Sequence, residues 1–189
     1  TGDQPLMAHI ELKGVSKAFG SAQALRDITL QIADGEFFVL LGETGAGKTT
    51  MLRVIAGLEK PNAGQVFIDG QDVTGWGAAE RDVALVLQQY SLYPRYTVRQ
   101  NLEFPLKSPI RKTSATEIAE RIARVAKTLR IEHLLDRKTD KLSGGEMQRV
   151  SIGRAIVRKP EVFLMDEPLS ALDAKLRESL RAELKDLQI

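Results

Sequence analysis

The segment Gly42–Thr49 has the residue types and the spacing of a phosphate-binding loop. It reads GETGAGKT and matches the pattern G-x-x-x-x-G-K-[ST]. Glycines let the backbone fold around an anion and point N–H groups at it from a helix N-terminus. Lys48 supplies a point charge for the β- and γ-phosphates, and the hydroxyl of Thr49 can ligate Mg²⁺. The alternative, a glycine-rich turn with a surface lysine, is weaker because a strand-like run precedes the loop and a helical pattern follows it.

Two carboxylates follow a second apolar run, Val162–Met165. Asp166 and Glu167 are adjacent at the end of this expected strand, so their side chains start on opposite faces. Asp166 can then hold Mg²⁺ through water, while Glu167 orients or deprotonates the water that attacks the γ-phosphate. Without the phosphate loop, two solvated acids at a strand end would be the better interpretation.

The stretch LSGGE, Leu142–Glu146, places a small loop rich in donors at the start of a helix far along the chain. Ser143 and Glu146 have capping-box spacing, and the helix dipole favours a phosphate there. A structural N-cap alone explains these two residues. It does not explain Gly144 and Gly145, because successive glycines lower helix stability.

Composition limits the possible partners. The chain has 189 residues, a net charge of +2 with dispersed Lys and Arg, and no cysteine. Nothing therefore argues for nucleic acid as a partner, and disulfides and thiolate metal sites are excluded. The longest strongly apolar run, Phe37–Leu41, is too short to span a bilayer, so we expect any membrane role to depend on docking onto another chain.

Apolar periodicity predicts strands that alternate with helices. Phe37–Leu41 has the continuous pattern of a strand buried on both faces, and Asp69-Gly70 is typical of a tight hairpin turn. The other expected strands are Ile28–Ile32, Val66–Ile68 with Val73, Val83–Leu87 and Val162–Met165. Expected helices are Lys48–Leu58 and three that start at Ser114 with a capping box to Glu117, at about Glu146 and at Leu172.

This order predicts an α/β fold, a P-loop NTPase with a mainly parallel sheet core, an antiparallel β subdomain and a helical insertion. We expect residues 1–6 to be a cloning remnant before a natural start at Met7. Residues 7–189 then form one nucleotide-binding domain, with a helical subdomain at about 92–158. We expect this domain to be incomplete at its C-terminus.

Taken together, the motifs resemble the ATP-binding subunit of ABC transporters. They are the phosphate loop, Gln88 in VLQQYSLYP, LSGGE, FLMDEP, and SALD at Ser170–Asp173. The resemblance extends over Met7–Ile189 and is greatest to bacterial sugar importers of the maltose type. It implies a subunit that binds and hydrolyses ATP with Mg²⁺ to power a membrane importer of carbohydrate or a related small solute.

The resemblance also implies roles for single residues. Two nucleotide-binding subunits meet head to tail, so that Ser143, Gly144 and Gly145 serve a nucleotide held by the partner copy. Gln88, rather than its neighbour Gln89, contacts Mg²⁺ and the attacking water. The expected catalytic residues are Glu167, Gln88 and Lys48, and the expected metal ligands are Thr49, Gln88 and Asp166. The residues expected to bind nucleotide are Phe19 (on adenine), Gly42, Glu43, Thr44, Gly45, Ala46, Gly47, Lys48, Thr49, Thr50, Ser143, Gly144, Gly145 and Asp173 (at the dimer interface).

The implied partners are transmembrane permease subunits and, indirectly, an extracytoplasmic solute-binding protein. The implied location is peripheral, on the cytoplasmic face of the inner membrane. The insertion around residues 90–101 would carry motion to the permease, and Tyr90, Leu92, Tyr93 and Tyr96 could line a groove for a partner helix. Alternatively, these side chains pack the insertion against the sheet.

Three features depart from the family pattern. Glu146 stands where the family usually has glutamine, which puts contacts of that side chain in question. Neither His9 nor His133 stands at the position of the family histidine that contacts the γ-phosphate. We also expect the C-terminal regulatory domain of such importers to be lacking. We therefore expect this chain to bind Mg·ATP but to hydrolyse it poorly and to dimerise weakly.

Two other functions share the phosphate loop. A soluble ABC ATPase of translation or DNA repair usually carries two cassettes or a coiled-coil insertion, and neither is visible here. A small-molecule kinase or GTPase would leave LSGGE unexplained. The cargo is open, because membrane and solute-binding partners select it.

Overall fold

The chain divides into two units, each described here by itself. A computed structural model describes residues 8–36, 38–87, 90–107 and 113–166. The first unit, called the phosphate-loop unit below, comprises the described residues up to Leu85 together with Pro160–Asp166. The second, called the helical unit, comprises the described residues within Val86–Lys159.

The phosphate-loop unit contains a four-stranded antiparallel sheet. Its strands are β1 (Ile10–Phe19), β2 (Ala22–Ile32), β3 (Ala63–Ile68) and β4 (Gln71–Asp72), in the order β2-β1-β3-β4. The expected hairpin at Asp69-Gly70 is confirmed, since Ile68 pairs with Gln71 across it. Both turn residues have positive φ, as a tight hairpin of this kind requires.

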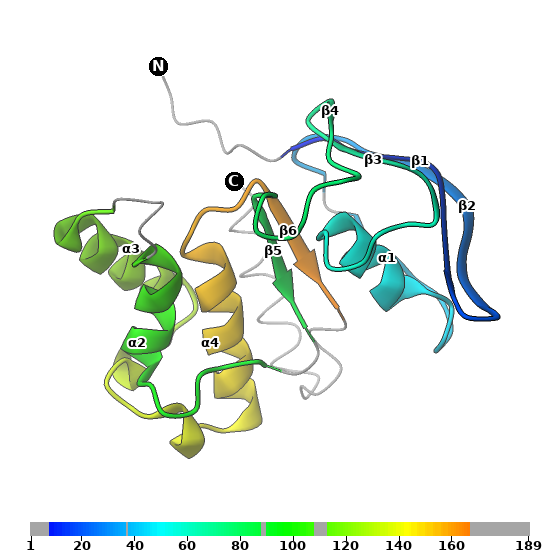
Figure 1. The fold of residues 1–189 in the computed structure, drawn as a ribbon. Helices are drawn as coiled ribbons and strands as arrows, with labels where there is room; N and C mark the ends of the chain where they lie inside the picture. The colour runs from blue at the N-terminus through cyan, green and yellow to red at the C-terminus, as the bar shows by residue number, and fades with distance from the viewer. Residues whose placement is uncertain (1–7, 37, 88–89, 108–112, 167–189) are drawn as a thin grey trace. The chain divides into compact units, whose positions relative to one another are not determined.

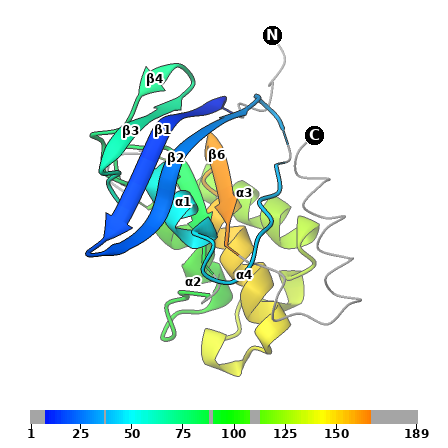
Figure 2. The same cartoon turned by 90° about the vertical axis from the view of Figure 1, so that its right-hand side faces the viewer.

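One face of this sheet packs on the helix that follows the phosphate loop, α1 (Lys48–Ile55), as Figure 2 shows. Leu12, Val15 and Val66 of the sheet are fully buried in one apolar cluster with Val54 and Ile55 of α1. Alternate residues of each strand face this cluster because side chains alternate across a pleated sheet. The antiparallel sheet therefore supports the helix that carries the phosphate loop.

A second sheet pairs β5 (Val83–Val86) with β6 (Val162–Met165). Both arrows point the same way in Figure 1, as in a parallel pair. These two predicted strands are confirmed. The prediction of a strand over Phe37–Leu41 is wrong for its described residues 38–41, which form no strand and expose Val39 and Leu41. An apolar run indicates a tendency toward burial, but strand formation also needs a neighbour to pair with.

The helical unit packs three α-helices and three short 3₁₀ helices around its own core. The α-helices are α2 (Val98–Glu103), α3 (Ala115–Thr128) and α4 (Gly144–Ile156), and the 3₁₀ helices are η1 (Phe104–Leu106), η2 (Glu132–Leu134) and η3 (Thr139–Lys141). Leu102, Leu129 and Ile152 are fully buried between them. A Cβ atom at Gly153 would lie 3.1 Å from side-chain carbons of Leu102 and Leu129, so this glycine permits the close packing of α4.

The predicted start of α3 is confirmed, and its capping box is half formed. The hydroxyl of Ser114 accepts the N–H of Glu117 at 3.2 Å. The carboxylate of Glu117 instead pairs with Arg121, one turn further along the helix. The predicted helix from Leu172 lies outside the described residues. Within the described ranges, no helix has the length and apolar character needed to cross a membrane.

Candidate functional site

The phosphate loop folds into a tight turn that leads directly into α1. Gly45 and Gly47 both have φ of 86°, a left-handed conformation that favours glycine. The ammonium of Lys48 donates hydrogen bonds to the carbonyl oxygens of Gly42 and Glu43, each at 2.8 Å. Lys48 therefore reaches back across the loop, and its positive charge lies within the turn that the sequence predicted to hold phosphates.

Strand β2 lies directly against this loop, a contact that the motif did not predict. A Cβ atom at Gly47 would overlap the carbonyl oxygen of Ala24 and lie 3.1 Å from a methyl carbon of Leu25. Gly47 is thus required for two reasons, its positive φ and the approach of β2. The motif pattern alone gives only the first.

The N-terminus of α1 is open to an anion. Its N-cap residue is Gly47, no side chain caps it, and no acidic residue lies in its first turn. The first N–H groups of a helix carry partial positive charge. Together with the Lys48 ammonium, they favour binding of a negatively charged group at the loop.

Thr49 and Asp166 are brought together from distant parts of the chain. The Thr49 hydroxyl donates to Oδ1 of Asp166 at 3.0 Å, and Asp166 is buried immediately after β6. β6 is held in place at its start, since the N–H groups of Glu161 and Val162 both donate to the carbonyl oxygen of Asp82.

A hydroxyl and a carboxylate are hard oxygen donors of the kind that Mg²⁺ prefers. Proteins typically hold this ion through one or two such groups, with waters and substrate phosphates completing its shell. Thr49 and Asp166 therefore fit the predicted magnesium site. Thr50, beside them on α1, is half-buried.

Phe19 lies at the end of β1, where the residue is 47% exposed. It pairs with Ala22 across the hairpin, close to the Ala24 backbone that contacts the phosphate loop. The ammonium of Lys17 lies 4.9 Å from the centre of its ring. An exposed ring at this place suits stacking on adenine, which stays a prediction.

Arg81 is a further residue that the sequence did not single out. It is buried, and its guanidinium donates to the carbonyl oxygens of Val54 and Ile55 at the C-terminal end of α1, at 2.8 and 2.7 Å. It also donates to the carbonyl oxygens of Val73 and Trp76. Burial lowers the pKa of Arg81, and the nearby carboxylates of Asp72 and Glu80 act in the opposite direction. A cation here complements the negative end of the helix dipole. Arg81 therefore fixes the far end of the phosphate-loop helix.

In the helical unit, Ser143 caps α4 as predicted. Its hydroxyl accepts the N–H of Glu146 at 3.3 Å, and Oε2 of Glu146 accepts the N–H of Ser143 at 2.7 Å. Ser143 donates to this carboxylate from its backbone N–H and also from its hydroxyl, and these two hydrogen bonds lower the pKa of Glu146. Burial acts in the opposite direction, and the positive charge of Arg137 adds a smaller lowering. The helix begins at Gly144, two residues before the predicted start at Glu146. Ser143 and Gly144 are exposed and Gly145 is half-buried.

Tyr90 is closely attached to the same helix. Its carbonyl oxygen accepts the hydroxyl of Ser151 at 2.9 Å, and a Cβ atom at Gly144 would lie 3.2 Å from its phenol oxygen. Arg154 donates to the carbonyl oxygen of Ser91 at 2.8 Å. Side chains of α4 therefore hold the backbone of the described segment that follows Gln88 and Gln89.

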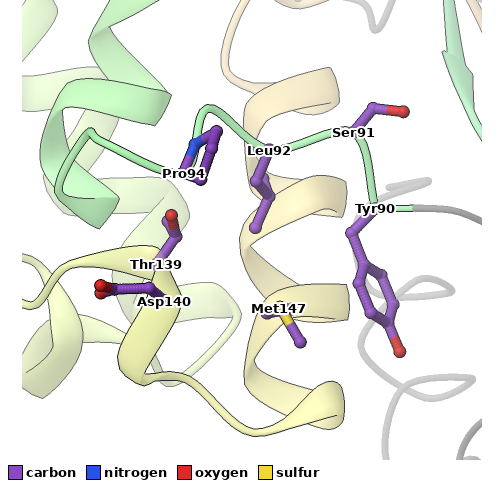
Figure 3. Close-up of a pocket in the computed structure, with 7 residues that line it drawn as sticks. All are labelled: Tyr90, Ser91, Leu92, Pro94, Thr139, Asp140 and Met147. Carbon is purple, nitrogen blue, oxygen red and sulfur yellow. The ribbon is translucent and has the colours of Figure 1, made fainter.

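A shallow pocket opens between this segment, η3 and α4 (Figure 3). It has a volume of about 260 Å³, and its lining residues are Tyr90, Ser91, Leu92, Pro94, Thr139, Asp140 and Met147. We call it the apolar pocket, because Leu92, Pro94 and Met147 give it a mostly apolar lining. Two of the four residues predicted for a partner groove, Tyr90 and Leu92, line it. The rings of Tyr93 and Tyr96 lie together with Phe104 in an exposed aromatic cluster.

The predicted site residues thus form two groups. The phosphate loop, Asp166 and Phe19 belong to the phosphate-loop unit, whereas Ser143, Gly144 and Gly145 belong to the helical unit. Gln88, Glu167 and Asp173 lie outside the described residues.

Comparison with known proteins agrees with this geometry. The family model described as ABC transporter matches residues 25–170. The chain is 55% identical over 183 residues to the sn-glycerol-3-phosphate import ATP-binding protein UgpC of Rhizobium meliloti (strain 1021), covering 96% of this chain and 52% of that protein. It is 53% identical over 188 residues to the trehalose/maltose import ATP-binding protein MalK of Thermococcus litoralis, covering 96% and 50%. The chain spans about half the length of the curated relatives it matches.

Solved structures share the fold. The dimeric post-hydrolysis state of the ATP-binding cassette MJ0796, bound to ADP and Pi, superposes with a TM-score of 0.84 at 34% identity. The match covers 95% of this chain and 82% of that one. A nucleotide-free ATP-binding cassette from an ABC transporter gives a TM-score of 0.83 at 27% identity, covering 96% of this chain and 78% of that one. These matches confirm the predicted α/β P-loop NTPase fold, and the chain belongs to the ABC transporter family.

Proposed function

We propose that this chain binds and hydrolyses ATP to power a membrane importer of carbohydrate or a related small solute. The observation that carries the proposal is the meeting of Lys48, Thr49 and Asp166 around one phosphate loop. Lys48 lies across the loop, and Thr49 contacts the carboxylate at the end of β6. A cation, a hydroxyl and a carboxylate together are what a Mg²⁺-bound triphosphate requires.

In the proposed reaction, Lys48 exchanges its hydrogen bonds to Gly42 and Glu43 for the β- and γ-phosphate oxygens. Thr49 and Asp166 would hold Mg²⁺, which neutralises charge that develops on the phosphates. Glu167 would orient or deprotonate the attacking water, and Gln88 would contact both that water and the metal. These two roles rest on the motifs and on family membership.

We further propose that two copies act as a head-to-tail pair. Ser143, Gly144 and Gly145 would complete the nucleotide site of the partner copy, with Asp173 at the interface. The exposure of Ser143 and Gly144 at the start of α4 supports this, because a donor-rich loop of this kind suits a phosphate. The solved cassette MJ0796 is dimeric with ADP and Pi bound, which also supports it.

The proposed partners are transmembrane permease subunits and, through them, a solute-binding protein outside the membrane. The apolar pocket offers a place for side chains of a permease helix, because Leu92, Pro94 and Met147 present apolar surface there. This arrangement would hold the chain at the cytoplasmic face of the membrane as a peripheral subunit. The proposed nucleotide-binding domain spans residues 7–189, and its helical subdomain spans residues 92–158 approximately.

Relatives support the class of cargo. Their names specify sn-glycerol-3-phosphate, xylose or arabinose, and trehalose or maltose. Sugars and a phosphorylated polyol are all small, hydroxyl-rich solutes. We therefore propose a cargo of this chemical class.

Reconstitution into liposomes with the permease encoded beside its gene tests the proposal. Wild-type protein should hydrolyse ATP faster when the solute-binding protein and a cognate sugar are supplied, and Lys48→Ala should abolish the response. Lys127→Ala, an exposed lysine on α3, is the matched control and should respond as wild type does. Failure of the wild-type protein to bind the permease at all would contradict the transport role.

A further inference from the structure

The carboxylate of Glu146 takes both of the protons that Ser143 can donate. Oε2 of Glu146 accepts the backbone N–H of Ser143 at 2.7 Å and its hydroxyl at 2.8 Å. An ionised carboxylate can only accept, so the hydroxyl proton must point at Glu146. Ser143 can donate that proton to a phosphate only after the hydroxyl rotates away from this carboxylate.

Glu146 also lines a cavity beside Ser143. A cavity of about 240 Å³ is lined by Ser143 and Gly145 together with Glu146, and its other lining residues are Arg130, Ile131, His133, Leu134 and Arg149. Glu146 is the one acid among these described lining residues. Arg137 approaches its other oxygen at 4.0 Å. The carboxylate thus offsets part of the positive charge around the Ser143–Gly145 loop.

The position of Glu146 on α4 strengthens this effect. It is in the first turn of the helix, where the dipole stabilises one negative charge. That place is already taken by the carboxylate, so an arriving phosphate meets a helix end whose positive potential is reduced. Hydrogen bonds from Ser143 lower the pKa of Glu146, which keeps the side chain charged at neutral pH.

We propose that Glu146 sets the nucleotide concentration at which two copies pair, by competing with the partner's triphosphate for Ser143 and repelling it. This inference rests on the proposed head-to-tail pair. It makes Glu146 a determinant of pairing and assigns it no part in the nucleotide affinity of a single copy. Because Glu146 raises the nucleotide concentration needed for pairing, it would also favour opening of the pair once the γ-phosphate has been released.

Glu146→Gln is a matched probe, because glutamine also completes a capping box. Its amide oxygen can accept the N–H of Ser143, so the cap is kept while the charge is removed. Its NH₂ group is a donor and can contact a phosphate. The control is Glu120→Gln, which removes the same charge from an exposed position on α3.

The experiment titrates the full chain with Mg²⁺ and adenylyl imidodiphosphate and follows pairing by sedimentation velocity. We expect Glu146→Gln to need about threefold to tenfold less nucleotide for half-maximal pairing than wild type, as removal of one charge near a triphosphate implies. The difference should shrink in high salt, because screening weakens charge repulsion. Glu120→Gln should pair as wild type does.

Two further measurements separate this role from a structural one. At concentrations where the protein is monomeric, nucleotide affinity should be equal in wild type and Glu146→Gln. The melting temperature of Glu146→Gln without nucleotide should fall only slightly, because glutamine keeps the cap and loses only the charge. Equal or weaker pairing of Glu146→Gln, at a protein concentration where the wild type pairs even weakly, would overturn the inference and leave the proposed function intact. If neither protein pairs although both bind nucleotide, the head-to-tail pair itself fails, and the inference fails with it.

Discussion

The hydroxyl of Thr49 lies 3.0 Å from Oδ1 of Asp166, although the two residues are separated by 117 positions in the chain. One stands in the first turn of α1, and the other follows β6. The contact joins the phosphate loop to the carboxylate at a strand end, two residues that the family resemblance implied as ligands of one metal ion. In the proposed function, these two side chains would hold Mg²⁺.

Replacement of Thr49 by alanine should raise the Mg²⁺ requirement for nucleotide binding by about tenfold, or about 1.4 kcal/mol, because one oxygen ligand is lost. Thr49→Ser keeps the hydroxyl and should stay close to wild type. A Mg²⁺ titration at constant ATP, followed by calorimetry, measures both variants. Equal Mg²⁺ requirements in all three proteins would show that Thr49 does not serve the metal.

Replacement of Lys48 by alanine should weaken ATP binding by at least about tenfold. The variant loses the positive charge at the phosphates and also the two hydrogen bonds that close the loop onto Gly42 and Glu43. Equilibrium binding of a fluorescent ATP analogue measures the effect. AMP, which lacks the β- and γ-phosphates, should bind both proteins with the same weak affinity, and a parallel loss for AMP would argue against a direct role on those phosphates.

Alanine at Gly47 should be more damaging than alanine at Gly45, although both glycines have the same φ of 86°. A Cβ atom at Gly45 meets nothing within 4 Å, so Gly45→Ala should cost only the conformational strain of about 1–2 kcal/mol. At Gly47 the added carbon also overlaps the backbone of Ala24 on β2. Chemical denaturation of the two variants gives the comparison, and equal losses of unfolding free energy would contradict the contact with β2.

The cap of α4 should respond to pH with a defined sign. The pKa of Glu146 in the folded protein is lowered from its ordinary value of 4.5. A lowered pKa means that the ionised side chain stabilises the fold above pH 4.5 and that this stabilisation is lost as the pH falls through the folded-state value. Glu146→Ala should therefore melt at a lower temperature than wild type at pH 7. The difference should diminish in acid, and a difference that grows below pH 4.5 would refute the assignment.

Much of this site follows from local rules that the sequence displays. The start of α4 depends on the Ser143 cap, and the hairpin at Asp69-Gly70 depends on residues that tolerate positive φ. The strand Val162–Met165 was predicted with its observed bounds, because a short apolar run bounded by polar residues is typical of a buried strand. Each of these features is determined by residues that are close to one another in the sequence.

Other features depend on contacts between distant segments and could not be predicted. Arg81 binds carbonyl oxygens of α1, and nothing in its neighbours distinguishes it from a surface arginine. The approach of Ala24 to Gly47 is likewise set by the packing of β2 on the loop. At residues 38–41 a local pattern gave a wrong prediction. Their apolar character predicted a strand, but they form none, because a strand also needs a neighbouring strand with which to pair.

The head-to-tail pair is the central claim, and the chain is well suited to a direct test because it has no cysteine. Ala46→Cys marks the exposed phosphate loop, and Lys141→Cys marks the exposed position just before Leu142 and Ser143. The two single-cysteine proteins, one carrying a mass tag, are mixed and treated with a short bifunctional maleimide. With Mg²⁺ and a non-hydrolysable ATP analogue, we expect a mixed product that joins the Ala46→Cys variant to the Lys141→Cys variant, and much less of it without nucleotide. If nucleotide yields no mixed product, or only products that join two copies of the same variant, the head-to-tail pair is contradicted.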